Sequence, residues 1–362
     1  MKNFTKSAVC AIALCAATMS SAEAQVKPDV NVGLLMHTYG SAEQIGFGGS
    51  TAVENGSDWS YGANLLRSRF MFDVKLTDKD YFFVESELTA SVGLGTDKAA
   101  SIKVLDARYD HKFSDLLTVS AGKILVSYNR NGIQGAGTLM ANNFSYFQYT
   151  ASGALNNDSG RDIGVNLSGT IIEDKLKYRV GAFSGRREFT NSDSAPLRYV
   201  GRLQYNFLDD DKYTGTNIGN GETFTIAAGF DTQGTYKAFG IDAFLDVPLG
   251  SAGSVTCNAA YSYMTGGDDL EAEFTFADVV PEQNIVFAEL GYYFKESKLQ
   301  PWVKYELQDT KYGADESVVG GGINYFFNGY RTNLRLSYIA RENSLVNKMY
   351  SQVWLQLQLF IF

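Results

Sequence analysis

Apolar and polar side chains alternate with a period of two along most of this chain. In residues 66–76, for example, Phe70, Phe72 and Val74 fall on one face of an extended strand, whereas Arg69 and Asp73 fall on the other. The same alternation returns in residues 82–90, 162–168, 176–182, 239–247 and 334–341. This repetition predicts an all-β protein whose strands each have one apolar and one polar face.

Two architectures are compatible with many such strands. In a soluble sandwich the apolar faces form a dry core, whereas in a transmembrane barrel they face lipid. The segments are too numerous for one compact core, lie close to the length of about 9–11 residues that crosses a bilayer, and carry Phe and Tyr near their ends. Strands cross a membrane only as a closed barrel, because every backbone group in lipid needs an internal partner. We therefore predict a transmembrane antiparallel β-barrel, with a secreted all-β domain as the alternative.

The composition agrees with this prediction and excludes a helical membrane protein. Hydrophobic residues make up 45% of the 362 residues, and the mean hydropathy is −0.15. Beyond the N-terminus, no run approaches the roughly 20 apolar residues of a membrane helix. Lipid-facing and water-facing residues cancel when they alternate, which gives a membrane barrel the average hydropathy of a soluble protein.

The N-terminus has the pattern of a secretory signal peptide. Lys2 and Lys6 precede an apolar run, and Ala22-Glu23-Ala24 is a small-x-small cleavage site. We therefore divide the chain into a signal peptide, residues 1–24, and a single transmembrane barrel domain, residues 25–362.

The mature part is acidic and has one cysteine. Without Lys2, Lys6 and Glu23 it retains 29 basic and 39 acidic residues, a net charge of 29 − 39 = −10. Nucleic acid is therefore not an expected partner. Cys257 excludes an intramolecular disulfide and is interpreted as a small lipid-facing residue.

Strand lengths and turn residues predict sixteen strands. They cover residues 29–39, 62–76, 81–92, 102–110, 117–128, 161–171, 175–185, 197–208, 222–232, 236–247, 254–265, 284–295, 299–308, 317–327, 332–342 and 350–361. Short connections alternate with long ones, as in barrels with short periplasmic turns and longer outer loops. Counting 142–152 as a strand would give an odd number, so 129–159 is predicted to be one inward-folded constriction loop. Residues 208–221 are long for a periplasmic turn and 232–235 short for an outer loop, which leaves eighteen strands as an alternative.

Nearly all strand charges fall on the polar faces, which predicts a water-filled lumen. The basic lumen residues are Arg67, Arg69, Lys75, Arg108, Lys177, Arg179, Arg198, Arg202, Lys304, Arg335 and Arg341. The acidic ones are Asp73, Glu85, Glu87, Asp106, Asp110, Asp162, Asp231, Asp242, Asp246, Glu289 and Glu306.

Strand 117–128 changes parity, because Val119 stands on one face and Ile124 on the other. A bulge at Gly122 would restore one lipid face and turn Lys123 inward. Arg130 follows at the root of the long loop.

Lys123 and Arg130, together with Arg67, Arg69 and Arg108, predict a basic wall in the lumen. Such a wall attracts anions, since low-dielectric walls strengthen the field of arginines in a confined pore. The alternative is that basic and acidic residues pair across neighbouring strands and leave little selectivity.

The residues do not assemble a catalytic or cofactor site. The chain has two histidines and no G-x-S-x-G motif, so we expect no enzyme activity, no cofactor and no metal. The acidic run Asp209-Asp210-Asp211 does not have EF-hand spacing and is interpreted as solvated loop charge.

Four stretches in a fixed order carry a family pattern. They are LRSRF at 66–70 continuing to 76, LDARY at 105–109 leading to SAGK at 120–123, GRDIGV at 160–165 leading to VGAFSG at 180–185, and GINYFF at 322–327 followed by LRLSY at 334–338. Together they extend over most of the mature chain, which resembles the phosphate-selective porin O/P family of outer-membrane channels.

The resemblance implies a 16-stranded barrel, usually trimeric, with an inward third loop and a basic anion path. By that match the best candidates for the path are Arg67, Arg69, Lys123, Arg130 and Arg161. Arg108, Arg179, Arg198 and Arg202 complete our candidate pore-lining set. The acidic lumen set and the net charge depart from a strongly basic channel, so the family name does not establish phosphate as the solute.

The C-terminal residues 355–362, LQLQLFIF, resemble the final-strand signal that the barrel-assembly machinery reads, including a terminal Phe362. They depart from it in parity, since the leucines and Ile361 share one face while Phe360 and Phe362 occupy the other.

We predict a passive porin in the outer membrane of a Gram-negative bacterium, for small hydrophilic solutes and with a preference for anions or phosphate. Its expected partners are these solutes, outer-membrane lipid and lipopolysaccharide, the barrel-assembly machinery and further copies of itself in a homotrimer. The alternative is a structural or adhesive outer-membrane barrel that binds a partner through its outer loops while residues 129–159 close the lumen.

Overall fold

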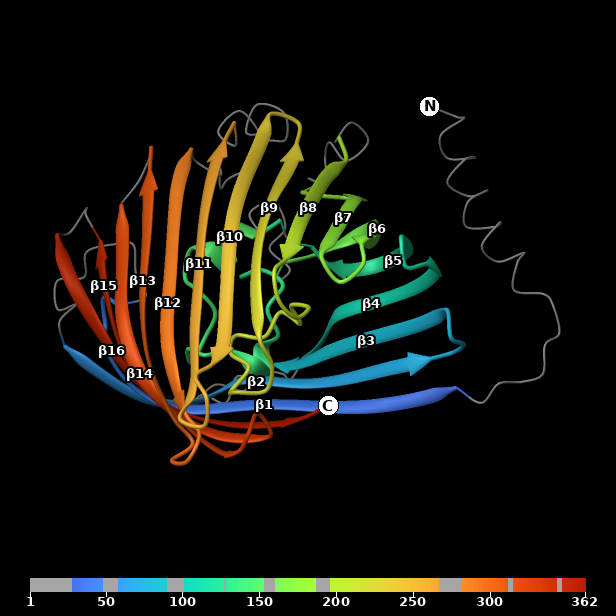
Figure 1. Ribbon diagram of the computed structural model, residues 1–362. Coiled ribbons are helices and arrows are strands. Elements are labelled where there is room, and N and C mark those ends of the chain that lie inside the picture. Colours follow the sequence, from blue (N-terminus) through green and yellow to red (C-terminus); the bar gives the residue numbers. More distant parts are fainter. Residues whose placement is uncertain are drawn as a thin grey trace.

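The computed structural model (Figure 1) describes residues 28–47, 58–89, 101–126, 128–152, 160–186, 196–266, 282–311, 315–343 and 347–362. The predicted signal peptide, residues 1–24, lies outside these ranges. No helix in the described part of the chain is long and apolar enough to cross a membrane.

Within the described ranges the chain forms sixteen strands. They are β1 (Asp29–Gln44), β2 (Trp59–Lys75), β3 (Asp80–Thr89), β4 (Ser101–Ser114), β5 (Leu117–Leu125), β6 (Arg161–Ile172), β7 (Leu176–Phe183), β8 (Arg198–Asn206), β9 (Thr223–Gln233), β10 (Tyr236–Pro248), β11 (Gly253–Thr265), β12 (Gln283–Phe294), β13 (Leu299–Thr310), β14 (Glu316–Asn328), β15 (Thr332–Asn343) and β16 (Lys348–Ile361). Neighbours in the chain pair in order, and β1 pairs antiparallel with β16, which closes the barrel. The prediction of a sixteen-stranded transmembrane barrel is confirmed, and the eighteen-strand alternative is wrong.

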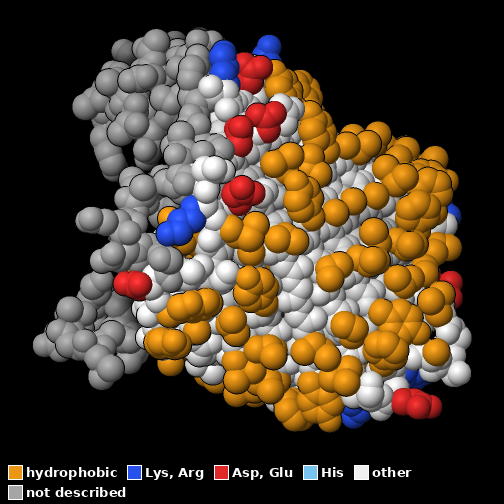
Figure 2. Space-filling model, turned by 90° about the vertical axis from the view of Figure 1, so that its left-hand side faces the viewer, with side chains coloured by type: hydrophobic (Ala, Val, Ile, Leu, Met, Phe, Trp, Pro, Cys, Tyr) orange, Lys and Arg blue, Asp and Glu red, His pale blue; other side chains and the backbone are white. Residues whose placement is uncertain are grey.

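The predicted alternation separates an apolar outer face from a polar inner face. On β2, Phe70 and Phe72 are each 43% exposed on the outer face. The alternate residues Arg69 and Met71 are buried on the inner face. In Figure 2 hydrophobic side chains cover most of the described surface of one face, and charged side chains are few and lie mostly toward its margins. A closed barrel pairs its backbone N–H and C=O groups between neighbouring strands, so a barrel with such an apolar belt can face lipid.

Aromatic rings gather at the end of the barrel that carries the short connections. The Tyr205 and Phe207 ring centroids lie 4.8 Å apart, and Phe207 stacks on Phe224 at 4.6 Å. Tyr325 and Phe327 form a similar pair at 4.7 Å. Amphipathic and aromatic rings favour the membrane–water boundary, so these pairs mark the expected interfacial girdle.

The connections assign the two ends of the barrel. Residues 76–79, 115–116, 173–175, 249–252, 295–298 and 329–331 are short connections on the side where β1 begins and β16 ends, which is the periplasmic end in barrels of this class. The two connections that fitted the sixteen-strand pattern poorly have simple explanations. Residues 234–235 close a tight hairpin in which Gly234 has a φ of 57°, and residues 207–222 fold into the lumen.

Candidate functional site: the barrel lumen

The connection between β5 and β6 folds into the lumen, as predicted. We call its described residues 128–152 the inward loop; they include a 3-10 turn, η1 (Ala136–Thr138), and a short helix, α2 (Gln148–Ser152). Side chains of β14, β15 and β16 donate to its backbone carbonyls: Asn324 Nδ2 to Met140 O at 2.8 Å, Arg335 Nη1 to Ala141 O at 3.0 Å and Gln358 Nε2 to Gly137 O at 2.7 Å. The inward loop is therefore fastened to one wall of the barrel.

Apolar side chains fill the space between the inward loop and the barrel. Met140 and Phe147 of the loop belong to one buried cluster with Ile285 of β12 and Trp302 of β13. Burying side chains of this size stabilises by about 1.5–3 kcal/mol each. This part of the lumen is packed with protein and not with water.

Two cavities occupy other parts of the lumen. The small cavity, about 330 Å³, is lined by Arg67, Arg69 and Glu87 from β2 and β3 and by Asn143 and Tyr149 of the inward loop. The periplasmic cavity, about 850 Å³, lies among the short connections next to β4–β8. Each is large enough for several water molecules, since one water takes up about 30 Å³ in the liquid.

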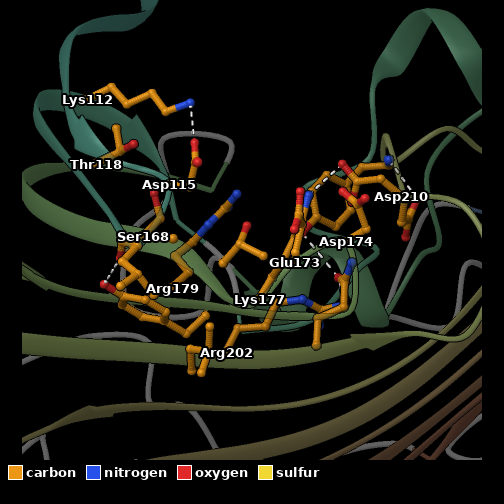
Figure 3. Close-up of a pocket in the computed structure, with 18 residues that line it drawn as sticks. Lys112, Asp115, Thr118, Ser168, Glu173, Asp174, Lys177, Arg179, Arg202 and Asp210 are labelled. Atoms are coloured by element: carbon orange, nitrogen blue, oxygen red, sulfur yellow. Dashed lines mark hydrogen bonds and ion pairs between the residues drawn. The ribbon is translucent and has the colours of Figure 1, made fainter. Parts of the chain in front are cut away.

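The periplasmic cavity is lined by hydroxyl and charged groups (Figure 3). Thr118 of β5 and Ser168 of β6 stand opposite each other in the ladder and both face it. At its rim, Lys112 Nζ lies 2.7 Å from the Asp115 carboxylate. The hydrogen bond from Lys112, and then its positive charge, lower the pKa of Asp115. Arg179 lies between this pair and the group that contains Lys177 (Figure 3).

Most of the predicted anion-path residues form ion pairs. Arg69 Nη1 lies 3.0 Å from Glu85, and Arg161 Nη2 lies 3.1 Å from the same Glu85 and 3.0 Å from Asp106. All four residues are buried, on β2, β3, β4 and β6. We call them the four-residue ion network. The Glu87 carboxylate also lies 3.5 Å from Arg69 Nε, so three carboxylates face two guanidinium groups and the positive charge is fully compensated.

Three further arginines are paired more deeply. Arg198 is bound by Asp231 at 2.5 Å, Arg202 by Asp242 at 2.5 Å and Arg130 by Asp211 at 2.7 Å. These six side chains are almost completely buried. Arg198 and Asp231 lie on the neighbouring strands β8 and β9, as the pairing interpretation predicts, whereas Arg202 pairs with Asp242 across β9 and Arg130 pairs with Asp211 between two connections. Each of these guanidinium charges is compensated by a carboxylate.

Arg67 and Arg179 differ from the paired arginines. Among the described residues neither has a carboxylate within ion-pair distance. Arg67 Nη2 donates to Asn143 Oδ1 at 2.6 Å, and Arg179 lies over the Tyr213 ring at 5.8 Å. Each lines one of the two cavities, so these are the guanidinium groups whose field a solute would meet.

Arg108 is intermediate between these two groups. Its Nε lies 3.0 Å from Asp110, and its guanidinium stands 5.0 Å from the centroid of the Phe83 ring. Its charge is therefore partly compensated.

Lys123 does not turn inward, so the predicted bulge at Gly122 is wrong. The β5–β6 ladder runs without a register shift and sets Lys123 opposite Ile163, which is 61% exposed on the outer face. Ile124 and Val126 point inward instead, because the apolar cluster under the inward loop covers them. Gly122 is required for another reason: its φ is 124°, and a Cβ there would lie 2.2 Å from the Ala107 carbonyl oxygen. β5 also ends at Leu125, three residues earlier than predicted.

Sequence reasoning missed several residues that organise the lumen. Asp211, interpreted as solvated loop charge, is buried against Arg130. His37 of β1 is fully buried, with Nε2 2.8 Å from Gln358 Oε1 and Nδ1 3.2 Å from Arg67 Nη1. The parity of His37 on β1 could be read from the sequence, whereas its partners and the burial of Asp211 depend on how the chain folds in three dimensions. In the described part of the chain no group of three or more His, Cys, Asp or Glu is placed to hold a metal ion.

Comparison with solved structures finds barrels of the same fold. The chain is similar to the outer-membrane channel DcaP of Acinetobacter baumannii, with a TM-score of 0.59 and 12% identity over 95% of this chain and 100% of that one. It is also similar to OmpT, an outer membrane protein of Vibrio cholerae (TM-score 0.54, 11% identity, 94% and 100% covered), and to OprB of Pseudomonas putida (0.53, 10%, 91% and 92%). At such identities the likeness establishes the fold alone.

The sequence matches no known protein-family model and no curated protein. The resemblance to the phosphate-selective porin O/P family therefore stays a prediction, while the wider porin fold is supported. A closed barrel of this fold with an apolar belt is an outer-membrane architecture, and we place the protein in the outer membrane of a Gram-negative bacterium.

Proposed function

We propose that this protein is a passive porin through which small hydrophilic solutes diffuse across the outer membrane. The observation that carries the proposal is that the lumen keeps two cavities lined by charged and hydroxyl side chains beside the packed inward loop. The four-residue ion network takes Arg69 and Glu85 from strands that line the small cavity, and Asp106 and Arg161 from strands that line the periplasmic cavity, so it is our candidate for the constriction. Swelling of vesicles that contain the purified barrel, measured with sugars of increasing size, tests this function.

We further propose a moderate preference for anions, carried by Arg67 and Arg179. Their guanidinium charges face the cavities, whereas Arg69, Arg130, Arg161, Arg198 and Arg202 are compensated by carboxylates. Phosphate belongs to the same proposal only as one small anion among others.

The reversal potential under a KCl gradient tests this preference. The double substitution R67Q/R179Q should shift it toward cation selectivity, while R179K, which keeps the charge, should leave it close to wild type. A wild-type channel with a zero or cation-selective reversal potential would contradict the preference.

The alternative function is a closed barrel that binds a partner through its outer connections. One observation favours it: the inward loop and the barrel wall share a large buried apolar cluster, which reduces the open cross-section. A folded barrel that causes no vesicle swelling would support this alternative.

The remaining predicted partners follow from the same proposal. Outer-membrane lipid and lipopolysaccharide would meet the apolar belt, the barrel-assembly machinery would read the end of β16, and further copies would form a homotrimer. Cross-linking of the purified protein tests the trimer, and N-terminal sequencing tests removal of residues 1–24 as a signal peptide.

A further inference from the structure

The connection between β8 and β9, residues 207–222, enters the lumen from the periplasmic end. Asp211 and Ile218 are buried and Thr216 has no exposed surface, although the other described connections at this end are short turns. A connection that only joined two neighbouring strands would need a few residues and would stay in water. We call residues 207–222 the periplasmic loop.

The periplasmic loop meets the inward loop, which arrives from the opposite end of the barrel. The Gly135 amide donates to Tyr213 O and the Gly215 amide donates to Thr138 O, each at 3.1 Å. The contact is close, since a Cβ on Gly215 would lie 2.6 Å from Leu139 Cα. The two loops therefore join through their backbones, at a position where a side chain would not fit.

A buried ion pair locks this junction. Arg130 Nε and Nη2 donate to the two carboxylate oxygens of Asp211 at 2.7 and 2.9 Å, and Nη2 also donates to Thr214 O at 2.6 Å. The Arg130 guanidinium carbon stands 3.5 Å from the centroid of the Phe244 ring. Both members of the pair have 0% side-chain exposure, so water does not weaken their attraction.

The periplasmic loop is also held by the barrel wall. The backbone N–H of Asn217 donates to the Asp246 carboxylate at 2.7 Å, and Gln300 Nε2 donates to Thr216 Oγ1 at 2.9 Å. The Tyr330 hydroxyl, from the β14–β15 turn, donates to Thr216 O. These bonds come from three different parts of the barrel and fix the loop across the lumen.

Two residues of the periplasmic loop have strained backbones. Tyr213 has a φ of 55° and Ile218 a φ of 46°, in the left-handed region that non-glycine residues, and β-branched ones above all, avoid. Such conformations persist only where the surroundings impose them. Without its contacts the loop would relax to another conformation.

We propose that the periplasmic loop is a second constriction element of this channel, and that Asp211 is the positioning residue that holds it against Arg130 of the inward loop. This inference rests on the proposed porin function. It adds the interlocked inward and periplasmic loops to the four-residue ion network as elements that set the width of the channel.

Single-channel recording of D211N tests the proposal, with D210N as the matched control. Asp210 is the adjacent residue, and its partner Lys177 lies partly exposed 2.5 Å away, so D210N removes the same charge without opening the junction. Removing one partner of a buried pair should raise the ratio of time spent in larger conductance levels to time spent in smaller ones by at least about 100-fold, given the usual penalty for such a loss. D210N, which changes the lining of the periplasmic cavity but not the junction, should keep the wild-type ratio of conductance levels. R130Q/D211N should be less perturbed than D211N, because no charge is left unpaired. A D211N channel with the levels and dwell times of D210N would overturn the proposal.

Two further measurements keep the proposal testable if D211N assembles poorly. G215A forces the loop backbones apart and should also produce larger conductance levels, whereas G62A, whose added Cβ would be 3.8 Å from its nearest neighbour, should not. A G215A channel identical to G62A would count against the junction. The temperature at which the barrel shifts its gel mobility on heating, measured for R130Q, D211N and R130Q/D211N, reports the energetic coupling of the pair and needs no current recording. Additive losses would refute the junction, whereas a wild-type barrel that does not conduct would refute only the porin function.

Discussion

Asp242 provides a quantitative test of the idea that buried charge pairs stabilise this lumen. Its carboxylate accepts from Arg202 Nη1 and Nη2 at 2.5 and 2.8 Å and from the Arg130 amide at 3.0 Å. Arg202 Nη1 also donates to Tyr128 O at 3.2 Å, so the pair joins β8 and β10 to the root of the inward loop. D242N keeps the shape of the side chain but leaves the buried Arg202 charge without its carboxylate.

The expected loss of unfolding free energy for D242N is about 3–5 kcal/mol, the usual result of breaking a buried pair by removing one partner. This is roughly two to three and a half powers of ten in the unfolding equilibrium constant. R202Q/D242N should lose less, about 1–3 kcal/mol, because only neutral hydrogen bonds are weakened and no charge stays unpaired.

Urea unfolding of the barrel in lipid vesicles, followed by tryptophan fluorescence, measures these losses. D78N is a suitable control, because Asp78 pairs with Lys75 at 2.7 Å on an exposed periplasmic turn, and its unfolding should match wild type. The reasoning is refuted if D242N unfolds like D78N, or if the double variant is less stable than D242N.

Three further predictions concern the barrel wall. G122A should lower the band-shift temperature through a loss of about 1–3 kcal/mol, because its φ of 124° and its contact with Ala107 O do not admit a Cβ; a G122A barrel as stable as G40A, whose added Cβ has space, would contradict this. Cys257 faces outward between Leu245 and Leu290 in the ladder, so a water-soluble maleimide should label it only after unfolding, and rapid labelling in vesicles would place it elsewhere. Deletion of Phe362, whose ring centroid lies 6.5 Å from that of Phe83, should reduce the amount of heat-modifiable barrel in outer membranes, and an unchanged amount would speak against an assembly role.

The strands and the parity of their side chains could be predicted from the sequence because both are local properties. Alternation with a period of two assigns Phe70 outward and Arg69 inward without any knowledge of neighbouring strands. The prediction failed at Gly122, where the same change of parity has two explanations. A bulge would turn Lys123 inward, while apolar contacts with a loop let Ile124 face the lumen, and only the loop packing decides between them.

The partners of the lumen charges could not be predicted in this way. Asp211 lies 81 positions from Arg130 in the chain, and nothing in its acidic run distinguishes it from the exposed Asp210 beside it. The unusual length of residues 208–221 was the available signal that this connection does more than join two strands. Pairing of Arg161 with Glu85 and Asp106 likewise depends on strands that are not neighbours in the chain.

The central claim, that this barrel is a water-filled passive channel, is tested most directly by recording currents from the purified, folded protein in a planar lipid bilayer. We predict stable, discrete conductance steps whose size rises with KCl concentration, without any added nucleotide. A barrel that is folded by its heat-modifiable mobility yet shows no conductance steps would contradict the claim.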